Sequence, residues 1–184
     1  LFYEPSGISI SSNNTFALIS DTNNNLIRKI ILTSNEVSLL SGNLIYGSNN
    51  GIGTNARFKY PQSVNLSPDN SYALIVDSSN NRIRKLILST LEVSTIAGSI
   101  LGNTNGIGTN AKFKFPTTIC FSSDSRYILI VDSGNHQIRK IIISTLEVTT
   151  IAGRNISGNN NGIGTNAKFN SPIGIDISSD NSYA

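Results

Sequence analysis

The chain repeats itself every 55 or 56 residues, and this self-similarity constrains its fold more than any other feature. The tripeptide IRK begins at Ile27, Ile83 and Ile138. Other residues recur with the same spacing: Pro5, Pro61, Pro116 and Pro172; Asp21, Asp77 and Asp132; Glu36, Glu92 and Glu147; and the first glycine of the hexapeptide GIGTNA at Gly51, Gly106 and Gly162. A period of this length indicates a solenoid, a propeller or another array of supersecondary units.

The repeat region covers residues 1–184, which we divide into units of residues 5–60, 61–115 and 116–171 and a partial unit of residues 172–184. The one-residue difference between units lies before GIGTNA, because its first glycine always precedes the next proline by ten residues. Loops tolerate insertions, so we expect a surface loop there. Since Ala184 aligns with Ala17, we expect a piece of a longer array, or a subunit completed by another chain.

The second unit contains four short segments that are typical of β-strands. Residues 63–67 alternate between polar and apolar, as in a half-buried strand, and residues 72–76 form an apolar run suited to a strand buried on both faces. Residues 82–88 and 92–97 are the third and fourth expected strands. Clusters of Asn, Ser, Asp and Pro separate them, as expected for turns.

Four antiparallel strands followed by a longer connector are the pattern of a propeller blade. Helical repeats are disfavoured because no apolar stripe of period 3.6 occurs and because Ile, Val, Thr, Ser and Asn favour strands and turns. A β-helix remains an alternative, although its repeats are usually shorter. We therefore predict an all-β fold of about three blades and the start of a fourth.

Composition excludes several other classes. Charged residues make up 14% and hydrophobic residues 38% of the chain, which argues against intrinsic disorder. The single Cys120 excludes a disulfide framework, and the single His136 excludes a zinc site of Cys and His ligands. No apolar run approaches ~18 residues, so membrane insertion is not expected.

The turn that precedes IRK identifies a resemblance. It reads Asn24-Asn25-Leu26 in the first unit, Asn80-Asn81-Arg82 in the second and Asn135-His136-Gln137 in the third. Together with the segments EVxTIAG and NGIGTNAxFxxP, this pattern resembles the NHL repeat in its long form, over essentially the whole chain. The resemblance implies a β-propeller of about six blades, of which this region would form a part, or a repeat array.

One position departs from the pattern that the resemblance implies. Asn50, Asn105 and Asn161 stand before the glycine, where many long NHL repeats have aspartate. Asn-Gly still suits a tight turn with positive φ, but an amide is a weaker ligand than a carboxylate for a cation such as calcium. We therefore expect no metal and no cofactor.

Charged residues that recur in every unit are expected to serve the blade itself. This applies to Asp21, Asp77 and Asp132, which would brace turns and pair with Arg28, Arg84 and Arg139 of the same or the next blade. The alternative is a charged ring on one face that binds a partner. Gly51, Gly106 and Gly162 are interpreted as connector residues, because no lysine and helix follow them as in a phosphate loop.

Nucleic acid is not an expected partner, although some NHL propellers bind single-stranded RNA on a positive face. Lys and Arg exceed Asp and Glu by only three, and there is no Trp. The Phe and Tyr residues lie in strands or beside the prolines, where we expect them in the core rather than as stacking platforms. His136 is not expected to be catalytic or to bind metal, and Cys120 is expected to be a small buried residue.

Three N-x-S/T sequons mark candidate glycosylation sites at Asn13, Asn65 and Asn155. Asn13 falls in an expected turn and Asn155 in the variable connector, so both are expected to be accessible. Asn65 lies within an expected strand and is the weaker candidate.

These observations favour a non-enzymatic scaffold, without catalytic residues, in a larger extracellular or cell-surface protein that binds other proteins or glycans. Near-identical units suit a polyvalent surface better than a single pocket. The alternative is a structural subunit of an extracellular filament, in which copies of the chain complete one another's units. An RNA-binding propeller and a propeller enzyme are less favoured, because the innermost segments carry only one carboxylate, Asp176.

Overall fold

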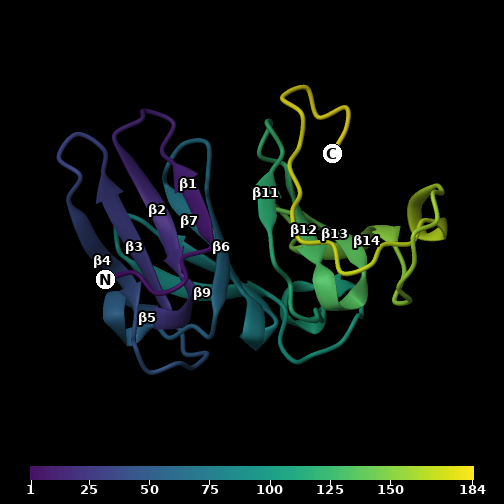
Figure 1. Cartoon of the computed structure of the whole chain (residues 1–184), viewed down its shortest axis with the longest axis horizontal. Helices are drawn as coiled ribbons and strands as arrows, with labels where there is room; N and C mark the ends of the chain where they lie inside the picture. The colour runs from purple at the N-terminus through teal and green to yellow at the C-terminus, as the bar shows by residue number, and fades with distance from the viewer.

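In the computed structural model, which describes residues 1–184, three antiparallel β-sheets stand side by side as consecutive blades (Figure 1). The first blade has four strands: β1 (Gly7–Ile10), β2 (Phe16–Asp21), β3 (Leu26–Ile31) and β4 (Val37–Gly42). Each strand pairs with the next strand in the chain. The prediction of an all-β fold with propeller-like, four-stranded blades is confirmed.

The second and third blades repeat this order and add a short outer strand. The second contains β6 (Pro61–Leu66), β7 (Tyr72–Asp77), β8 (Arg82–Ile87) and β9 (Glu92–Ala97), with β5 (Gly51–Ile52) beside β9. The third contains β11 (Ile119–Phe121), β12 (Tyr127–Asp132), β13 (Gln137–Ile142) and β14 (Glu147–Gly153), with β10 (Gly106–Ile107) beside β14. Every third strand is shifted in register against its fourth just before the recurring arginine.

Six short 3₁₀ helices complete the pattern. Three follow the second strand of a blade: η1 (Thr22–Asn24), η3 (Ser78–Asn80) and η5 (Ser133–Asn135). Three lie in the connectors: η2 (Gly53–Asn55), η4 (Gly108–Asn110) and η6 (Gly164–Asn166).

The first and second connectors each belong to the blade that follows them. Residues 43–60 leave the first blade, yet Gly51 and Ile52 pair with Val93 and Glu92 of the second. The next connector does the same, because Gly106 pairs with Val148 of the third blade. The sequence units assign each connector to the preceding blade, so the sheet boundary lies about 18 residues before the unit boundary at Pro61.

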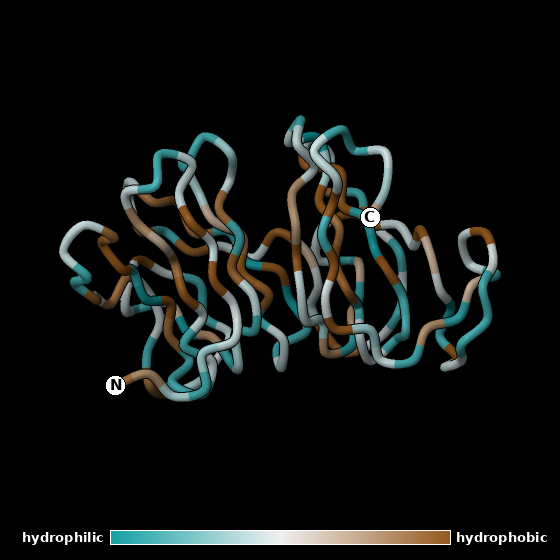
Figure 2. Tube along the Cα trace, turned by 45° about the horizontal axis from the view of Figure 1, so that its top comes forward, coloured by the Kyte–Doolittle hydropathy of each residue, from teal (hydrophilic) through white to brown (hydrophobic).

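The hydrophobic cores lie between neighbouring blades. One core joins Leu18 and Ile27 of the first blade to Val64 and Ile75 of the second. The other joins residues of the second blade, such as Leu74, to residues of the third. Phe58 and Phe113 anchor the two connectors in these cores. Figure 2 shows hydrophobic segments along the strands and mostly hydrophilic ones at the turns. Burial between blades explains why one unit could not fold alone.

Two aromatic residues beside the prolines lie outside the core, contrary to expectation. Tyr60 is 43% exposed and Phe115 is 47% exposed. Both have a left-handed backbone, with φ of 51° and 46°, which turns their side chains away from the blade. The residue before a proline is ordinarily extended, so the expectation that these aromatic residues lie in the core did not allow for this left-handed turn.

Residues 172–184 contain no strand but run beside the third blade (Figure 1). The Thr117 hydroxyl donates to the carbonyl oxygen of Ile173 at 2.8 Å. The amide side chain of Asn181 donates to the Ser123 hydroxyl at 2.7 Å. None of the helices is long and apolar enough to span a bilayer.

Candidate functional site

Asp and Arg residues that recur in the sequence meet in an ion pair within each blade. In the second blade, Arg84 Nη1 lies 2.8 Å from Asp77 Oδ2, and both side chains are fully buried. The third blade repeats this distance between Arg139 and Asp132. In the first blade, Arg28 lies 3.3 Å from Asp21, and its side chain is 19% exposed. The structure therefore pairs these residues within one blade.

The buried arginine also holds the connector. Arg84 Nη2 donates to the Asn49 carbonyl and to Asn50 Oδ1, each at 2.9 Å, and Arg84 Nη1 donates to the Arg57 carbonyl at 3.1 Å. Arg139 makes the equivalent bonds to the carbonyls of Thr104 and Lys112 and to Asn105 Oδ1. Asn50 and Asn105 stand where the resemblance implied an aspartate. Their side-chain oxygens thus accept a hydrogen bond from a cation.

Asp77 is surrounded by donors. Its carboxylate accepts the Lys59 backbone N–H at 2.7 Å and the Asn80 side-chain amide at 2.9 Å, besides Arg84. Burial raises the pKa of Asp77, and these hydrogen bonds and the guanidinium oppose that shift. Burial also lowers the pKa of Arg84, against the attraction of Asp77. A dense set of donors of this kind is what a buried ion pair requires.

A second repeated contact joins each blade to the connector of the next. Asn25, Asn81 and His136 end the turns after η1, η3 and η5 in the left-handed conformation. Asn25 Oδ1 accepts the Tyr60 N–H at 3.0 Å, Asn81 Oδ1 accepts the Phe115 N–H at 2.9 Å, and His136 Nδ1 accepts the Ser171 N–H at 2.9 Å. The single histidine therefore occupies a position that asparagine fills in the other blades.

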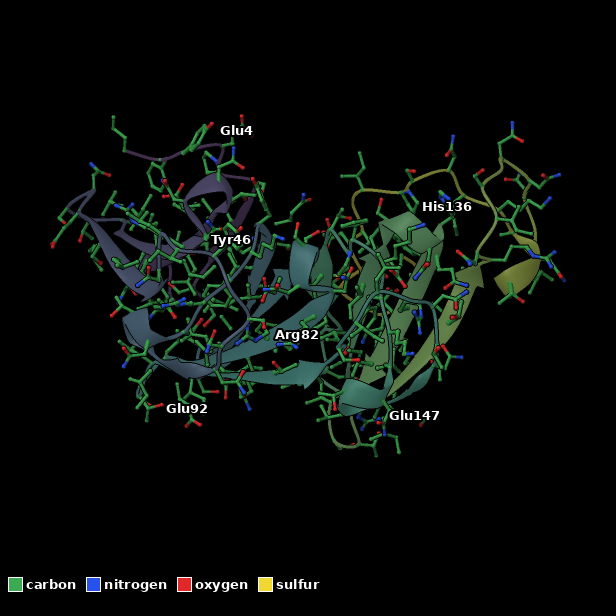
Figure 3. All side chains as sticks on the ribbon, turned by 90° about the horizontal axis from the view of Figure 1, so that it is seen from below. Glu4, Tyr46, Arg82, Glu92, His136 and Glu147 are labelled. Carbon is green, nitrogen blue, oxygen red and sulfur yellow. The ribbon has the colours of Figure 1, made fainter.

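Exposed apolar side chains gather at the same end of the blades. Leu44 is 69% exposed, and Ile45, Tyr46, Ile100 and Leu101 are exposed as well. Figure 3 looks onto this end and shows Tyr46, Arg82 and His136 on it, whereas Glu92 and Glu147 lie at the outer margin. Sequence reasoning missed this surface; the signal for it was the recurrence of apolar residues in the variable part of each connector.

The remaining candidates are scattered. Asn13 lies exposed in the turn between β1 and β2, Asn155 lies exposed in the third connector, and Asn65 is half-buried in β6. Cys120 is buried in β11, and burial raises the pKa of its thiol to about 12. The recurring glycines Gly51 and Gly106 lie in β5 and β10, and Gly162 precedes η6. No three His, Cys, Asp or Glu side chains lie together in a way that could hold a metal ion.

The chain resembles curated proteins that carry the same type of repeat. It is 29% identical over 161 residues to bovine "NHL repeat-containing protein 2", covering 80% of this chain and 22% of that protein. It is 30% identical over 159 residues to "Protein SUPPRESSOR OF QUENCHING 1, chloroplastic" of Arabidopsis thaliana, covering 77% of this chain and 15% of that protein. The chain thus spans about a fifth of the length of these relatives or less. No family model matches it.

Solved structures show the same fold. An auxiliary nutrient binding protein of Bacteroides thetaiotaomicron superposes with a TM-score of 0.75 at 21% identity, over 95% of this chain and 43% of that one. A virginiamycin B lyase of Staphylococcus aureus superposes with a TM-score of 0.54 at 19% identity, over 79% of this chain and 40% of that one. At such identities the likeness concerns the fold.

Proposed function

Because the chain consists of NHL-type repeats folded as β-propeller blades, we propose that it is a non-enzymatic binding scaffold in a larger extracellular or cell-surface protein. Its partners in this proposal are other proteins or glycans. The proposal rests on what the recurring charged residues bind in the structure. Arg84 and Arg139 bind their own connectors, so the polar groups common to the blades build a rigid frame that displays loops.

The comparisons support a binding role without deciding between ligands. One structural neighbour is named as a nutrient binding protein and another as a lyase, so the fold serves both binding and catalysis. An enzyme built on repeats needs residues in one blade that differ from those in the others. Here the ion pair has the same partners and the same 2.8 Å distance in the second and third blades, which favours a scaffold.

Binding can be tested with the purified chain on a protein array and a glycan array. The scaffold predicts saturable binding to at least one ligand, which competes with an excess of unlabelled chain. A chain that binds nothing on either array, yet cleaves or eliminates a substrate in a screen of esters and lactones, would show that the proposal is wrong.

The extracellular location can be tested through the sequons. Expression in a secreting eukaryotic cell is expected to yield chains that lose mass on treatment with an N-glycosidase, and Asn13→Gln and Asn155→Gln are each expected to remove one glycan. Asn65→Gln is the matched control, because Asn65 is half-buried in β6. Glycan-free chains from native material would contradict this location.

A filament is the alternative function, because the first and second connectors each bind in a sheet other than the one they leave. Such a connector is able, in principle, to come from a neighbouring copy by β-augmentation. Negative-stain electron microscopy of the native full-length protein separates the two. Discrete rings support the scaffold within one chain, and filaments with a regular axial repeat support the alternative.

A further inference from the structure

We infer that the connector end of the second and third blades is a docking surface for an acidic, partly apolar segment of a partner protein. The surface comprises residues 44–46 and 57–60 on the second blade and residues 100–101 and 112–115 on the third. This inference deepens the proposed function and rests on it, because it names the face and the chemistry of the partner.

The connectors carry only positive charge. Residues 43–60, 99–115 and 154–171 contain no Asp or Glu, and their cations are Arg57, Lys59, Lys112, Lys114, Arg154 and Lys168. Asp77 and Asp132, which accept the backbone N–H groups of Lys59 and Lys114, are buried and paired with arginine. Glu4 occupies the corresponding place on the first blade, so the surface is confined to the second and third. A net charge of +3 for the whole chain therefore conceals a strongly basic end.

The other carboxylates of these blades lie elsewhere. Asp69 and Asp124 are in the turns between the first and second strands, at the opposite end of the blades from the connectors. Figure 3 places Glu92 and Glu147 at the outer margin, away from Tyr46 and Arg82. The potential over the connector end is therefore positive, and it favours an anionic partner.

The backbone that carries Lys59 and Lys114 is held in place before any partner arrives, and two of the connector side chains are packed as well. The Lys59 backbone N–H binds Asp77 Oδ1 at 2.7 Å, and its ammonium lies 5.0 Å from the centre of the Tyr46 ring. The Lys114 N–H binds Asp132 in the same way at 2.8 Å. The side-chain methylenes of Lys112 pack against Gly102. Groups that are already ordered lose less entropy on binding.

Apolar side chains adjoin these cations. The Asn25 side chain lies between the two apolar segments of the second blade, donating to the Leu44 carbonyl at 3.5 Å and accepting the Tyr60 N–H. On the third blade, Leu101 pairs with Phe113, two residues before the exposed Phe115. Single exposed apolar residues are common on proteins, but a cluster of them that two blades repeat marks an interaction site.

The aliphatic residues favour protein over the other anionic partners. Nucleic acids and sugars bind aromatic faces by stacking and gain little from leucine and isoleucine. A protein segment offers carboxylates for the lysines and apolar side chains for Leu44, Ile45 and Ile100, whose exposure is unexplained by the fold. Tyrosine and phenylalanine are also enriched at protein interfaces.

The third connector indicates substitutions that the same backbone conformation accepts. Asn170 and Ser171 stand where Lys59 and Tyr60 stand in the second blade and where Lys114 and Phe115 stand in the third, and Ser171 has the same left-handed φ. The test variant, called the fourfold variant, therefore combines the four substitutions Lys59→Asn, Tyr60→Ser, Lys114→Asn and Phe115→Ser. The control is Arg126→Ser, a charge loss in the turn between β11 and β12, where the second blade has Ser71.

The probe is a fluorescent random copolymer of glutamate and tyrosine, titrated with the full chain at two salt concentrations. We expect saturable, salt-sensitive binding that weakens about tenfold or more in the fourfold variant and is unchanged in Arg126→Ser. Thermal melting should be the same for all three proteins, which confirms that the fold is retained.

Three outcomes would overturn the inference. The first is that the unmodified chain does not bind the copolymer, and the second is that the fourfold variant binds it equally well. The third is that oligouridylate or phosphatidylserine vesicles bind more tightly than the copolymer and lose that binding in the fourfold variant. If the fourfold variant still binds the array ligands, only the assignment of the face is wrong. If the unmodified chain binds neither array, the scaffold itself is wrong.

Discussion

Single residues of this protein show which roles a repeated sequence reveals and which it hides. Recurrence of Asp77 and Arg84 in every unit predicted a structural pair, and the two residues lie in contact. The attachment of Arg84 to Asn50 was not predictable, because it depends on how the connector folds back. The exposure of Tyr60 was not predictable either, because it accompanies a left-handed backbone and a hydrogen bond to Asn25, which is distant in the sequence.

Arg84→Met tests the buried pair. The substitution leaves the Asp77 carboxylate buried without its cation and releases the Asn49 and Asn50 contacts. We expect the free energy of unfolding to fall by about 3–5 kcal/mol, measured by urea denaturation. Arg126→Met is the control, because the Arg126 side chain is 84% exposed, and a surface change should stay within about 0.5 kcal/mol. Equal stability of the two variants would argue against the role of the pair.

Asp69 provides a pH-dependent test. Hydrogen bonds from the Ser67 hydroxyl and from the backbone and hydroxyl of Ser71 lower its pKa to about 2. Since the folded pKa lies below the unfolded value of 3.8, the stabilisation is present above pH 4 and is lost as the pH falls towards 2.

Asp69→Asn should therefore lower the melting temperature at pH 5 and have little effect near pH 2. The measurement is the difference in melting temperature between the unmodified chain and the variant across this range. A difference that stays constant with pH would mean that the ionised carboxylate contributes nothing.

At the scale of elements, the strands were predictable and the connectors were not. The fourth strand of the second blade was expected at residues 92–97, which is the range of β9. The first strand was expected at residues 63–67, and β6 begins two residues earlier, at Pro61, and ends at Leu66. β5 escaped prediction because Gly51-Ile52 has no strand pattern of its own and pairs only because the connector lies beside β9.

Glycines in the connectors and directly before them differ in how strictly they are required. Gly98 has a φ of 84°, and an added Cβ would lie 2.3 Å from the Asn81 carbonyl oxygen. Gly53 has a φ of 54° with open space around it. We expect Gly98→Ala to lower the free energy of unfolding by more than about 3 kcal/mol and Gly53→Ala by about 1 kcal/mol. Denaturant titration of the two variants measures this, and a reversed order would contradict the steric explanation.

At the scale of the whole molecule, the junctions between blades are not equivalent. Between the first and second blades, the turns are joined by Ser12 and Asn70, with the Asn70 amide donating to the Ser12 hydroxyl at 2.6 Å. The Ser12 backbone N–H also donates to Asn70 Oδ1 at 3.0 Å. Between the second and third blades, the aligned residues are Pro68, which has no backbone N–H, and Ser125, which has no side-chain amide. Repetition predicted three similar blades, but this difference rests on two residues within turns.

The missing contact can be restored. Pro68→Ser combined with Ser125→Asn should recreate the pair seen at Ser12 and Asn70, and should raise the free energy of unfolding by about 1 kcal/mol. Each single substitution should have a smaller effect, because one partner is still absent. A double-mutant cycle measures the interaction energy. A coupling of zero would show that the two turns lie too far apart to bond.

The interlocked connectors also determine how such an array can be lengthened. Residues 43–98 hold the connector, its outer strand and the four strands to which it is fastened. A module cut at the prolines, residues 61–115, would separate β5 from β9 and would leave β10 without its neighbour β14. Duplicating or grafting residues 43–98 keeps every sheet whole, so a genetic exchange that adds or removes a blade is best tolerated when its breakpoints fall directly after Gly42 and Gly98.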